Sequence, residues 1–363
     1  MTPRPYDPAE PLGPGRTVVE ASAGTGKTFT IAAELTRLVA VEGLDLEEIL
    51  VVTFTRAATA ELRHRVRRRL VDTAKALGDG VADNTDAALA ALLAADPADR
   101  DVFAARIAVA ITRFDRAQIF TIHGFASRLL AQLGLRARLS PDLEPDEIDE
   151  TLLAEVAGDL VVGRFAADAT GLLQPKAVAA LGGAVMTVPD ARIVPDAAGV
   201  TGSARTRVEM AYAMRAELRR RMTLAGTGTW DDGLVEVADA LADPEIGAAA
   251  RALLHRRYSV ALVDEAQDTD PIQWDVIRAV FDPSRLVVIG DPKQSIYSFR
   301  GADVESYLAA VEGADARRTL DVNHRSDGPL VTALDTLFTG ATFGDDRIAY
   351  QPVRAAPEHE TAR

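Results

Sequence analysis

A glycine-rich segment near the start of the chain carries residues suited to holding a phosphate chain. It lies between an apolar run and a helix-length segment, and its residues are Ala21, Ser22, Ala23, Gly24, Thr25, Gly26, Lys27 and Thr28. Glycines let backbone N–H groups approach phosphates, and the helix that follows adds its positive N-terminal end. Lys27 can reach β- and γ-phosphates, and Thr28 can ligate Mg²⁺. The segment predicts a P-loop with Ala21 in place of the usual first glycine, and the alternative is a glycine turn before an ordinary helix.

Two adjacent carboxylates supply the second half of a nucleotide site. Asp264 and Glu265 end an apolar run, and ligands gather at the carboxyl ends of strands in open α/β sheets. Asp264 would hold Mg²⁺ through its water shell, and Glu265 would accept the proton of the water that attacks the γ-phosphate. An isolated Asp–Glu pair usually belongs to a solvated loop, so this interpretation depends on the P-loop. Together the two segments predict ATP hydrolysis with Mg²⁺.

The elements that must position these residues alternate along the chain. Short β-branched runs, each typical of a buried parallel strand, cover residues 17–20, 49–54, 118–122, 259–264 and 286–290. Helix-length segments such as residues 28–41 and 57–77 lie between them. This alternation predicts an α/β fold with a doubly wound parallel sheet.

The alternation is interrupted once. Residues 136–229 contain Ala-rich, charged segments of helical character and no comparable strand-like run, which predicts an inserted helical domain. The ATPase domain would then comprise residues 1–135 and 230–322. Residues 78–101 are rich in Ala and Asp, and they predict a helix flanked by mobile loops.

Composition limits the classes of protein that the chain can represent. Its 363 residues are 48% hydrophobic, which is enough for two or three domains with their own cores. The net charge of −14 argues against a protein that coats DNA electrostatically, although it allows a local track. The Arg-rich residues 61–69 are left out of the site, because a helix would spread their charges over several faces.

Other classes are excluded by what the sequence lacks. No apolar run approaches the roughly 20 residues needed to cross a bilayer, and residues 1–12 do not have the apolar character of a signal peptide. We therefore expect a cytoplasmic protein without a membrane partner. The absence of cysteine excludes disulfides, thiolate zinc sites and iron–sulfur clusters.

Segments between and beyond the two nucleotide motifs resemble the motifs of the UvrD/RecB family of superfamily 1 DNA helicases. Residues 52–58 resemble its motif Ia, and residues 121–125 resemble its next DNA-contacting motif. Residues 290–302, Gly-Asp-Pro-Lys-Gln-Ser-Ile-Tyr-Ser-Phe-Arg-Gly-Ala, are nearly complete as its motif III, and residues 320–326 resemble motif IV. The resemblance covers nearly the whole chain and implies a RecA-like P-loop NTPase domain that drives a DNA motor.

The resemblance also implies roles for individual residues. DNA contacts would come from Thr53, Phe54, Thr55, His123, Phe125, Tyr297, Phe299 and Arg300. An aromatic face stacks on any base and a hydroxyl meets a phosphate, so the grip would be independent of sequence. Gln294 would contact the γ-phosphate, and Arg325 would be an arginine finger that offsets charge on the transferring phosphoryl group. The alternatives are a buried ring at a strand end for Phe54 and a surface cation for Arg325.

Within this family, residues 20–31, 119–125 and 264–271 resemble the RecB type, the exodeoxyribonuclease V subunit, more than the UvrD or AddA types. The Trp-Asp-Asp sequence at residues 230–232 supports the same assignment. This resemblance implies a helicase or translocase that acts on single-stranded DNA and DNA ends in double-strand-break repair and recombination, with RecC-like and RecD-like partners. A UvrD-like or AddA-like helicase is one alternative, and a non-catalytic module that binds DNA or partners is another.

The last part of the chain is expected to begin a second motor domain. Residues 323–363 include the end of motif IV, and they contain neither the family's motifs V and VI nor its nuclease metal site. We therefore expect the 363-residue chain to hydrolyse ATP weakly, to lack processive unwinding and to end in a disordered tail over residues 355–363. Adenine specificity is not predicted, because His324 replaces a frequent aromatic residue and no adenine-reading Gln motif precedes the P-loop.

Overall fold

The chain forms two compact units. The first comprises Met1–Ile122 and Ala249–Arg363, and the second, His123–Ala248, is inserted between them. The predicted domain limits at residues 135 and 230 both fall inside the second unit, so those limits stay a prediction. The computed structural model describes residues 3–80, 86–133, 144–145, 149–163, 174–187, 192–225, 227–228, 230–281, 284–297 and 302–360.

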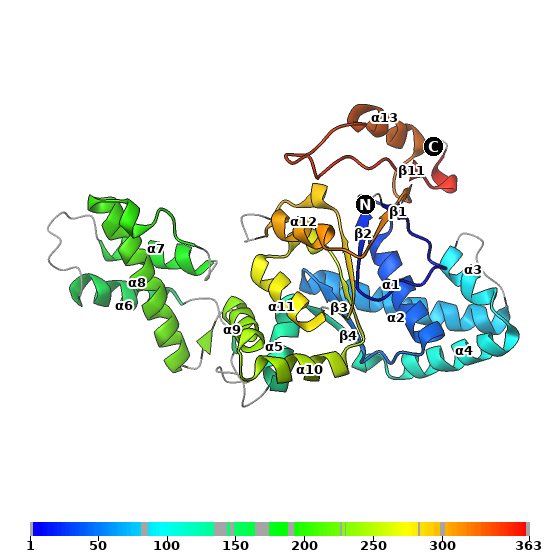
Figure 1. The fold of residues 1–363 in the computed structure, drawn as a ribbon, viewed down its shortest axis with the longest axis horizontal. Coiled ribbons are helices and arrows are strands. Elements are labelled where there is room, and N and C mark those ends of the chain that lie inside the picture. Colours follow the sequence, from blue (N-terminus) through cyan, green and yellow to red (C-terminus); the bar gives the residue numbers. More distant parts are fainter. Residues whose placement is uncertain are drawn as a thin grey trace. The chain divides into compact units, whose positions relative to one another are not determined.

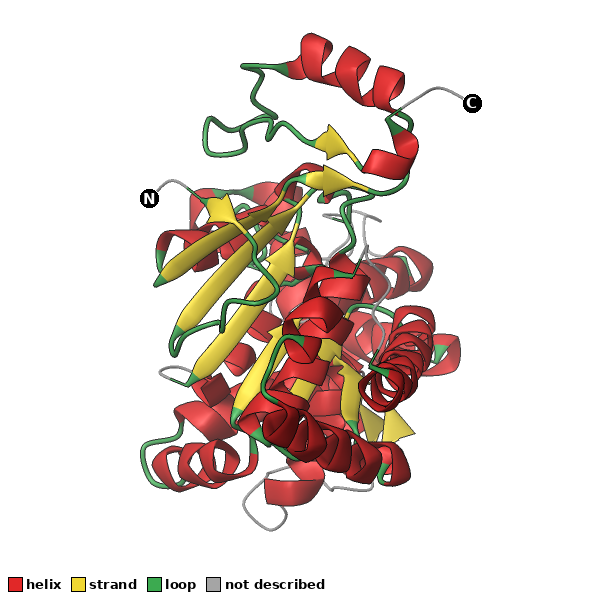
Figure 2. Cartoon of the chain, turned by 90° about the vertical axis from the view of Figure 1, so that its right-hand side faces the viewer, coloured by secondary structure: helices red, strands yellow, loops and turns green. Residues whose placement is uncertain are grey.

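An all-parallel, seven-stranded sheet organises the first unit (Figures 1 and 2). Its strands in spatial order are β1 (Arg4–Pro5), β9 (Ala316–Leu320), β2 (Arg16–Ala21), β8 (Arg285–Gly290), β7 (Val260–Val263), β3 (Ile49–Thr53) and β4 (Gln118–Thr121). Five of these strands coincide with the predicted runs, and the predicted α/β class with a parallel sheet is confirmed. Strands β3 and β7 are buried along their whole length, which explains their uninterrupted apolar sequences.

Strand β9 was not predicted, although it is as long as β3. Its sequence is Ala-Arg-Arg-Thr-Leu, and only Leu320 is fully buried. A strand next to the edge of a sheet can keep polar side chains half-buried, so it lacks the continuous apolar run that marks a central strand. Strand β9 matters for the site, because it carries the chain toward residues 323–325.

Helices cover both faces of the sheet (Figure 1). One side holds α1 (Lys27–Arg37), α2 (Arg56–Asp79), α3 (Ala87–Leu93) and α4 (Pro97–Thr112), and the other holds α11 (Pro271–Phe281) and α12 (Val304–Glu312). A π-helical turn, Leu38–Glu42, continues α1, and α10 (Gly247–Arg257) precedes β7. The stretch 78–101 contains the end of α2, the whole of α3 and the start of α4 rather than one helix, and residues 81–85 lie outside the described part. No helix in the described residues is long and apolar enough to cross a membrane.

The helices and strands of the first unit share one hydrophobic core. Its members include Ile31 of α1, Leu62 of α2, Ile107 of α4 and Leu262 of β7, each at most 1% exposed. Side chains this deeply buried stabilise the sheet through removal of apolar area from water. This core fixes the strand ends that carry the predicted nucleotide motifs.

The second unit is helical in its described part, apart from two strands of two residues. Its helices are α5 (which begins in the first unit, Ile122–Leu133), α6 (Glu150–Gly163), α7 (Pro175–Thr187), α8 (Gly202–Ala225) and α9 (Trp230–Ala242). The short strands β5 (Glu144–Pro145) and β6 (Thr227–Gly228) pair in parallel. A core rich in methionine, with Met186, Met210 and Met214, joins α6 to α8. Methionine fills irregular gaps between helices, which suits a bundle without a sheet.

The C-terminal segment of the first unit adds a small separate layer. It contains the parallel pair β10 (Val322–Asn323) and β11 (Arg354–Ala355), helix α13 (Gly328–Phe338) and a 3₁₀ turn, Pro357–His359. We predicted a disordered tail from Ala355, but the structure describes an ordered course through Glu360 in which Ala356 is fully buried. Ala356 N donates to Asn323 O at 2.8 Å, and this bond explains the order.

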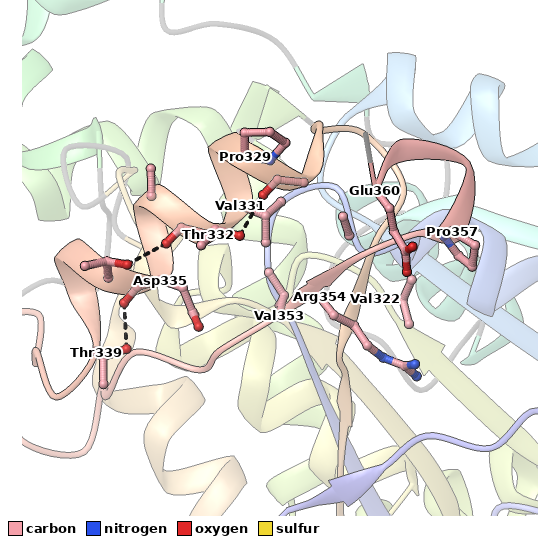
Figure 3. Close-up of a pocket in the computed structure, with 14 residues that line it drawn as sticks. Val322, Pro329, Val331, Thr332, Asp335, Thr339, Val353, Arg354, Pro357 and Glu360 are labelled. Carbon is pink, nitrogen blue, oxygen red and sulfur yellow. Dashed lines mark hydrogen bonds between the residues drawn. The ribbon is translucent and has the colours of Figure 1, made fainter. Parts of the chain in front are cut away.

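A cavity of about 1040 Å³ opens between α13 and β11 (Figure 3). Three of its lining hydroxyl groups, on Thr332, Thr336 and Thr339, donate to carbonyl oxygens one turn earlier in α13. Its lining contains none of the residues predicted for the nucleotide site. We assign it no role in ATP chemistry.

Candidate nucleotide and DNA site

The P-loop joins β2 to α1 in the way the sequence predicts. Gly24 and Gly26 have φ values of 81° and 90°, in the left-handed region that glycine adopts without strain. Gly26 is the N-cap residue of α1 and has no side chain to occupy the first N–H groups of the helix. Thr25 Oγ1 donates to Ser22 O at 2.7 Å and tightens the turn. The loop therefore presents a helix N-terminus of the kind that binds phosphate.

Two predicted catalytic residues, Glu265 and Gln294, and the predicted phosphate-binding residue Lys27 are brought together by three neighbouring strands. Lys27 Nζ, after β2, lies 2.5 Å from Glu265 Oε2, after β7. The same ammonium lies 3.4 Å from Gln294 Oε1, which follows β8. The side chain of Lys27 is only 12% exposed, so its charge is largely screened from water by these partners. Residues far apart in the sequence thus converge because their strands are adjacent.

The backbone at Glu265 is strained. Its φ of 49° is the single positive value at a non-glycine residue in the described ranges. Such a conformation costs roughly 1–3 kcal/mol and persists only where the surroundings enforce it. Glu265 N donates to Asp264 Oδ1 at 3.0 Å, and this bond helps to hold the turn. The strain directs the Glu265 carboxylate toward Lys27.

Burial changes the acidity of two carboxyl groups near this turn. Burial, and then the negative charge of Glu265, raise the pKa of Asp264 to about 6, and Lys27 opposes the rise. The same causes raise the pKa of Asp268 to about 6. A hydroxyl and a buried carboxylate are oxygen donors of the kind that Mg²⁺ accepts, and a cation would relieve the repulsion between Asp264 and Glu265. Thr28 and Asp264 therefore fit the predicted metal role.

Sequence reasoning missed Gln267, which connects the two motifs after β7 and β8. Its side chain is 1% exposed. Its Nε2 donates to Glu265 Oε2 at 2.9 Å, and its Oε1 accepts from Asp291 N at 2.9 Å. A Cβ added at Gly290 would lie 2.8 Å from Gln267 Oε1, so this glycine permits the close approach. An amide donates and accepts at once, which suits it to bridge a carboxylate and a backbone N–H.

Residues of motif IV donate hydrogen bonds to carbonyl oxygens of the P-loop. His324 N donates to Gly24 O at 2.8 Å, and Asn323 Nδ2 donates to Ala23 O at 3.2 Å. Asn323 Oδ1 accepts from Arg325 N at 2.8 Å, which fixes the turn that carries Arg325. The Arg325 side chain is exposed. Sequence reasoning selected Arg325 but missed Asn323, whose contacts depend on β9 lying beside β2.

A second cavity, of about 1020 Å³, opens beside the P-loop. Its wall includes Thr25 and Gly26 of the loop, Phe29 of α1 and His324. Phe29 is 48% exposed, so its ring offers an apolar face at the cavity wall. The hydroxyl of Thr73, also in the wall, is buried and has no hydrogen-bond partner in the described part of the chain. The cavity therefore offers an aromatic face, while the Thr73 hydroxyl lies buried behind its wall.

The predicted DNA-contacting residues after β3 and β8 meet at one place. The rings of Phe54 and Tyr297 have centroids 5.4 Å apart and planes tilted by 31°. Thr53 is 1% exposed, and its hydroxyl pairs with that of Thr59 at 2.6 Å. Thr55 caps α2, because its Oγ1 accepts from Ala58 N at 3.0 Å. Both rings are half-buried, whereas the two hydroxyls already have structural partners.

The other predicted DNA-contacting residues lie elsewhere. His123 and Phe125 belong to the second unit, at the start of α5. Phe125 is fully buried, so its ring would have to leave its packing to stack on a base. Phe299 and Arg300 lie outside the described residues. Their assignments stay predictions.

The Arg-rich run 61–69 forms part of α2 and spreads over different environments. Arg65 pairs with Glu61 at 2.5 Å, and this pair is more than half exposed. Arg69 makes two bonds to Asp86, one of 2.9 Å, and its guanidinium lies 4.8 Å from the centre of the Phe29 ring. Arg65 and Arg69 are thus partnered within the chain, which supports leaving the run out of the DNA site.

Comparison with known proteins shows the family to which the chain belongs. The sequence profile of the UvrD/REP helicase N-terminal domain matches residues 3–314, and the chain belongs to that family. The chain is 40% identical to the RecBCD enzyme subunit RecB of Mycobacterium tuberculosis H37Rv over 331 residues, which are 90% of this chain and 30% of that subunit. The RecB subunit of Mycolicibacterium smegmatis is 38% identical over 93% of this chain and 31% of its own length. That of Escherichia coli K12 is 28% identical over 98% of this chain and 41% of its own length.

These relatives confirm the predicted resemblance to the RecB type. The chain spans between 30% and 41% of their lengths.

Proposed function

We propose that the chain is the ATP-binding part of a RecB-type DNA motor, which hydrolyses ATP and uses the energy to move along single-stranded DNA. The convergence of Lys27, Glu265 and Gln294 carries this proposal, because it joins a phosphate-binding cation, a general base and a γ-phosphate contact. Family membership supplies the link from ATP hydrolysis to DNA.

Lys27 and Glu265 form an ion pair, with Nζ 2.5 Å from Oε2. Phosphates entering the P-loop would draw Lys27 toward their own charge, and Glu265 would then be free to accept the proton of the attacking water. Arg325, exposed on the turn that clamps Gly24, would swing its guanidinium to the transferring phosphoryl group. Mg²⁺ held by Thr28 and Asp264 would supply further charge stabilisation.

We place the nucleoside of ATP in the cavity beside the P-loop. Phe29 and His324 line that cavity and could face the two sides of a planar base.

Phe54 and Tyr297 would form the stacking surface for single-stranded DNA. They follow β3 and β8, and Tyr297 lies three residues beyond Gln294. One short segment therefore connects the γ-phosphate contact to the proposed DNA contact, which supports coupling of hydrolysis to strand movement. Thr53, Thr55, His123, Phe125, Phe299 and Arg300 complete the set of proposed contacts.

The relatives suggest the wider setting. Their name, RecBCD enzyme subunit RecB, supports RecC-like and RecD-like partners. We further propose action at DNA ends in repair and recombination, in the cytoplasm at the nucleoid. A UvrD-like or AddA-like helicase would share the same ATP site without those partners.

Phosphate release with and without single-stranded DNA tests the function. We expect DNA to stimulate release by the native chain and not by Lys27→Ala. Lys75→Met is the matched control, because it removes an ammonium from an exposed position of α2. Equal rates for the native chain and Lys27→Ala would favour the non-catalytic binding module.

A further inference from the structure

Four charged residues form a cluster at the start of motif III: Glu20, Asp291, Lys293 and Arg317. The proposed chemistry does not use this cluster. Lys293 Nζ lies 2.7 Å from Asp291 Oδ1 and 3.5 Å from Glu20 Oε1. Arg317 of β9 adds a second cation, 3.9 Å from Glu20 Oε2. The side chains of Lys293 and Glu20 are 12% exposed and that of Asp291 is 2% exposed. Two buried anions are thus balanced by two cations.

Asp291 fixes the orientation of the Gln294 amide. Gln294 Nε2 donates to Asp291 Oδ2 at 2.8 Å. A carboxylate can only accept, so the NH₂ group of the amide must face Asp291. The carbonyl oxygen of the same amide consequently faces Lys27, 3.4 Å from its Nζ. Asp291 therefore determines which atom of Gln294 is presented to the phosphate site.

The carboxylate of Asp291 needs Lys293. A buried anion without a partner is strongly disfavoured, and Glu20 brings a second negative charge into the same cluster. Burial raises the pKa of Glu20, and Lys293 opposes that rise. Without the ammonium, Asp291 Oδ1 would lose its 2.7 Å ion pair and keep the backbone N–H of residue 293 as a partner. The carboxylate would then be free to turn away from Gln294, and the amide would lose the bond that orients it.

The position of the cluster couples the two phosphate-binding motifs. Glu20 is the register partner of Gly290 in adjacent strands, and it directly precedes the P-loop. Asp291 directly follows Gly290 and begins the turn Pro292–Gln294. Lys293 therefore joins the strand end before the P-loop to the turn that carries Gln294.

We propose that Lys293 is a positioning residue for ATP hydrolysis, which acts through Asp291 on the amide of Gln294 and so on recognition of the γ-phosphate. This inference rests on the proposed function. It predicts that Lys293 affects affinity for a triphosphate and leaves affinity for a diphosphate nearly unchanged, because only the triphosphate reaches Gln294.

Calorimetric affinities of the 363-residue chain for ADP and for the non-hydrolysable analogue AMP-PNP, both with Mg²⁺, test this inference. We expect Lys293→Met to weaken AMP-PNP binding about tenfold and ADP binding less than twofold. Lys75→Met is the matched control and should change neither. In the Gln294→Ala background, Lys293→Met should add no further loss of AMP-PNP affinity, since its effect passes through the amide.

The outcomes separate this inference from the proposed function. A native chain that binds neither nucleotide would overturn both. A native chain that prefers AMP-PNP, with Lys293→Met keeping that preference, would overturn only the role of Lys293. Additive losses in the double variant would show that Lys293 acts by another route. If Lys293→Met does not fold, Lys293→Gln with Asp291→Asn removes the charge pair together, and it should bind AMP-PNP better than Asp291→Asn alone.

Discussion

Lys27, Glu265 and Gln294, here called the ATP corner, differ in construction from the Phe54–Tyr297 pair. The ATP corner uses two charged side chains and one amide, on the segments that follow β2, β7 and β8. Its central lysine, Lys27, has a side chain that is 12% exposed. The aromatic pair uses half-buried rings on the loops after β3 and β8. The first region contains several bonds between charged and polar groups, whereas the second contains a contact between two aromatic rings.

The difference follows from what each region is proposed to do. Phosphoryl transfer needs charges held at fixed positions in a site of low dielectric constant. Stacking on bases needs only an available aromatic face, and every base has one. Substitutions in the ATP corner should therefore have larger and more specific effects than substitutions in the aromatic pair.

The largest effect should come from Glu265→Gln. The amide keeps the shape of the side chain but cannot accept the proton of the attacking water, so DNA-stimulated phosphate release should fall by about 10²–10⁴-fold. Affinity for Mg·ADP should stay within about threefold, because Lys27 and the P-loop remain. Rapid phosphate release by this variant would remove Glu265 from the role of base.

Gly24→Ala should have the next largest effect. A Cβ at Gly24 would lie 2.9 Å from Arg325 Cβ and from Asn323 Oδ1, and the φ of 81° disfavours any side chain. We expect a loss of about 2–3 kcal/mol in the free energy of unfolding, measured by urea denaturation. Gly80→Ala is the matched control, since its φ is 69° with nothing within 4 Å, and it should cost about 1 kcal/mol. Equal losses would mean that motif IV does not clamp the P-loop.

Phe54→Ala should have a smaller effect, on DNA binding. Removal of one stacking face should reduce affinity for an oligothymidine strand about tenfold, measured by fluorescence anisotropy. Its affinity for ADP should not change. Glu265→Gln provides the reciprocal control, because it should leave DNA affinity without nucleotide unchanged. An equal effect of Phe54→Ala on both ligands would contradict the proposed division between the two regions.

The smallest effect should be a release of protons at Asp264, the proposed Mg²⁺ ligand. Burial raises the pKa of Asp264 from 3.8 to about 6, and Mg²⁺ needs this carboxyl group ionised. Binding of Mg·ADP should therefore release a fraction of a proton at pH 6 and almost none at pH 8. Calorimetry in two buffers of different ionisation enthalpy measures this release, and Asp264→Asn should reduce it.

The raised pKa values of Asp264 and Asp268 set the sign of a stability effect. A raised pKa means that the folded chain binds more protons than the unfolded chain between pH 3.8 and about 6. The stability from these two groups is therefore greatest at low pH and is lost as the pH rises through about 6. The gain in unfolding free energy on lowering the pH should be smaller in Asp264→Asn.

Sequence patterns predicted candidate residues for the nucleotide site, but they did not predict the contacts between those residues. The spacing of the P-loop and the carboxylate pair after β7 predicted Lys27, Asp264 and Glu265, because local chain geometry dictates where such motifs occur. Gln267 and Asn323 lie within the motif segments, but their bonds could not be read from the sequence, since a buried amide has no preferred neighbours in sequence. The DNA contact of Phe125 stays a prediction, because the sequence does not distinguish an aromatic residue that contacts a base from one that packs in a core.

The sequence by itself determined the parallel α/β class, the family and the order of the motifs, because strand runs and glycine turns depend on local residues. Only the tertiary structure decided that Lys27 meets both Glu265 and Gln294, that β9 lies beside β2, and that Lys293 joins Glu20 to Asp291. The physical reason is strand order. Strand β8 lies between β2 and β7 in the sheet, although β2 and β7 are more than two hundred residues apart in the chain. Only the packed core fixes which strand ends come together.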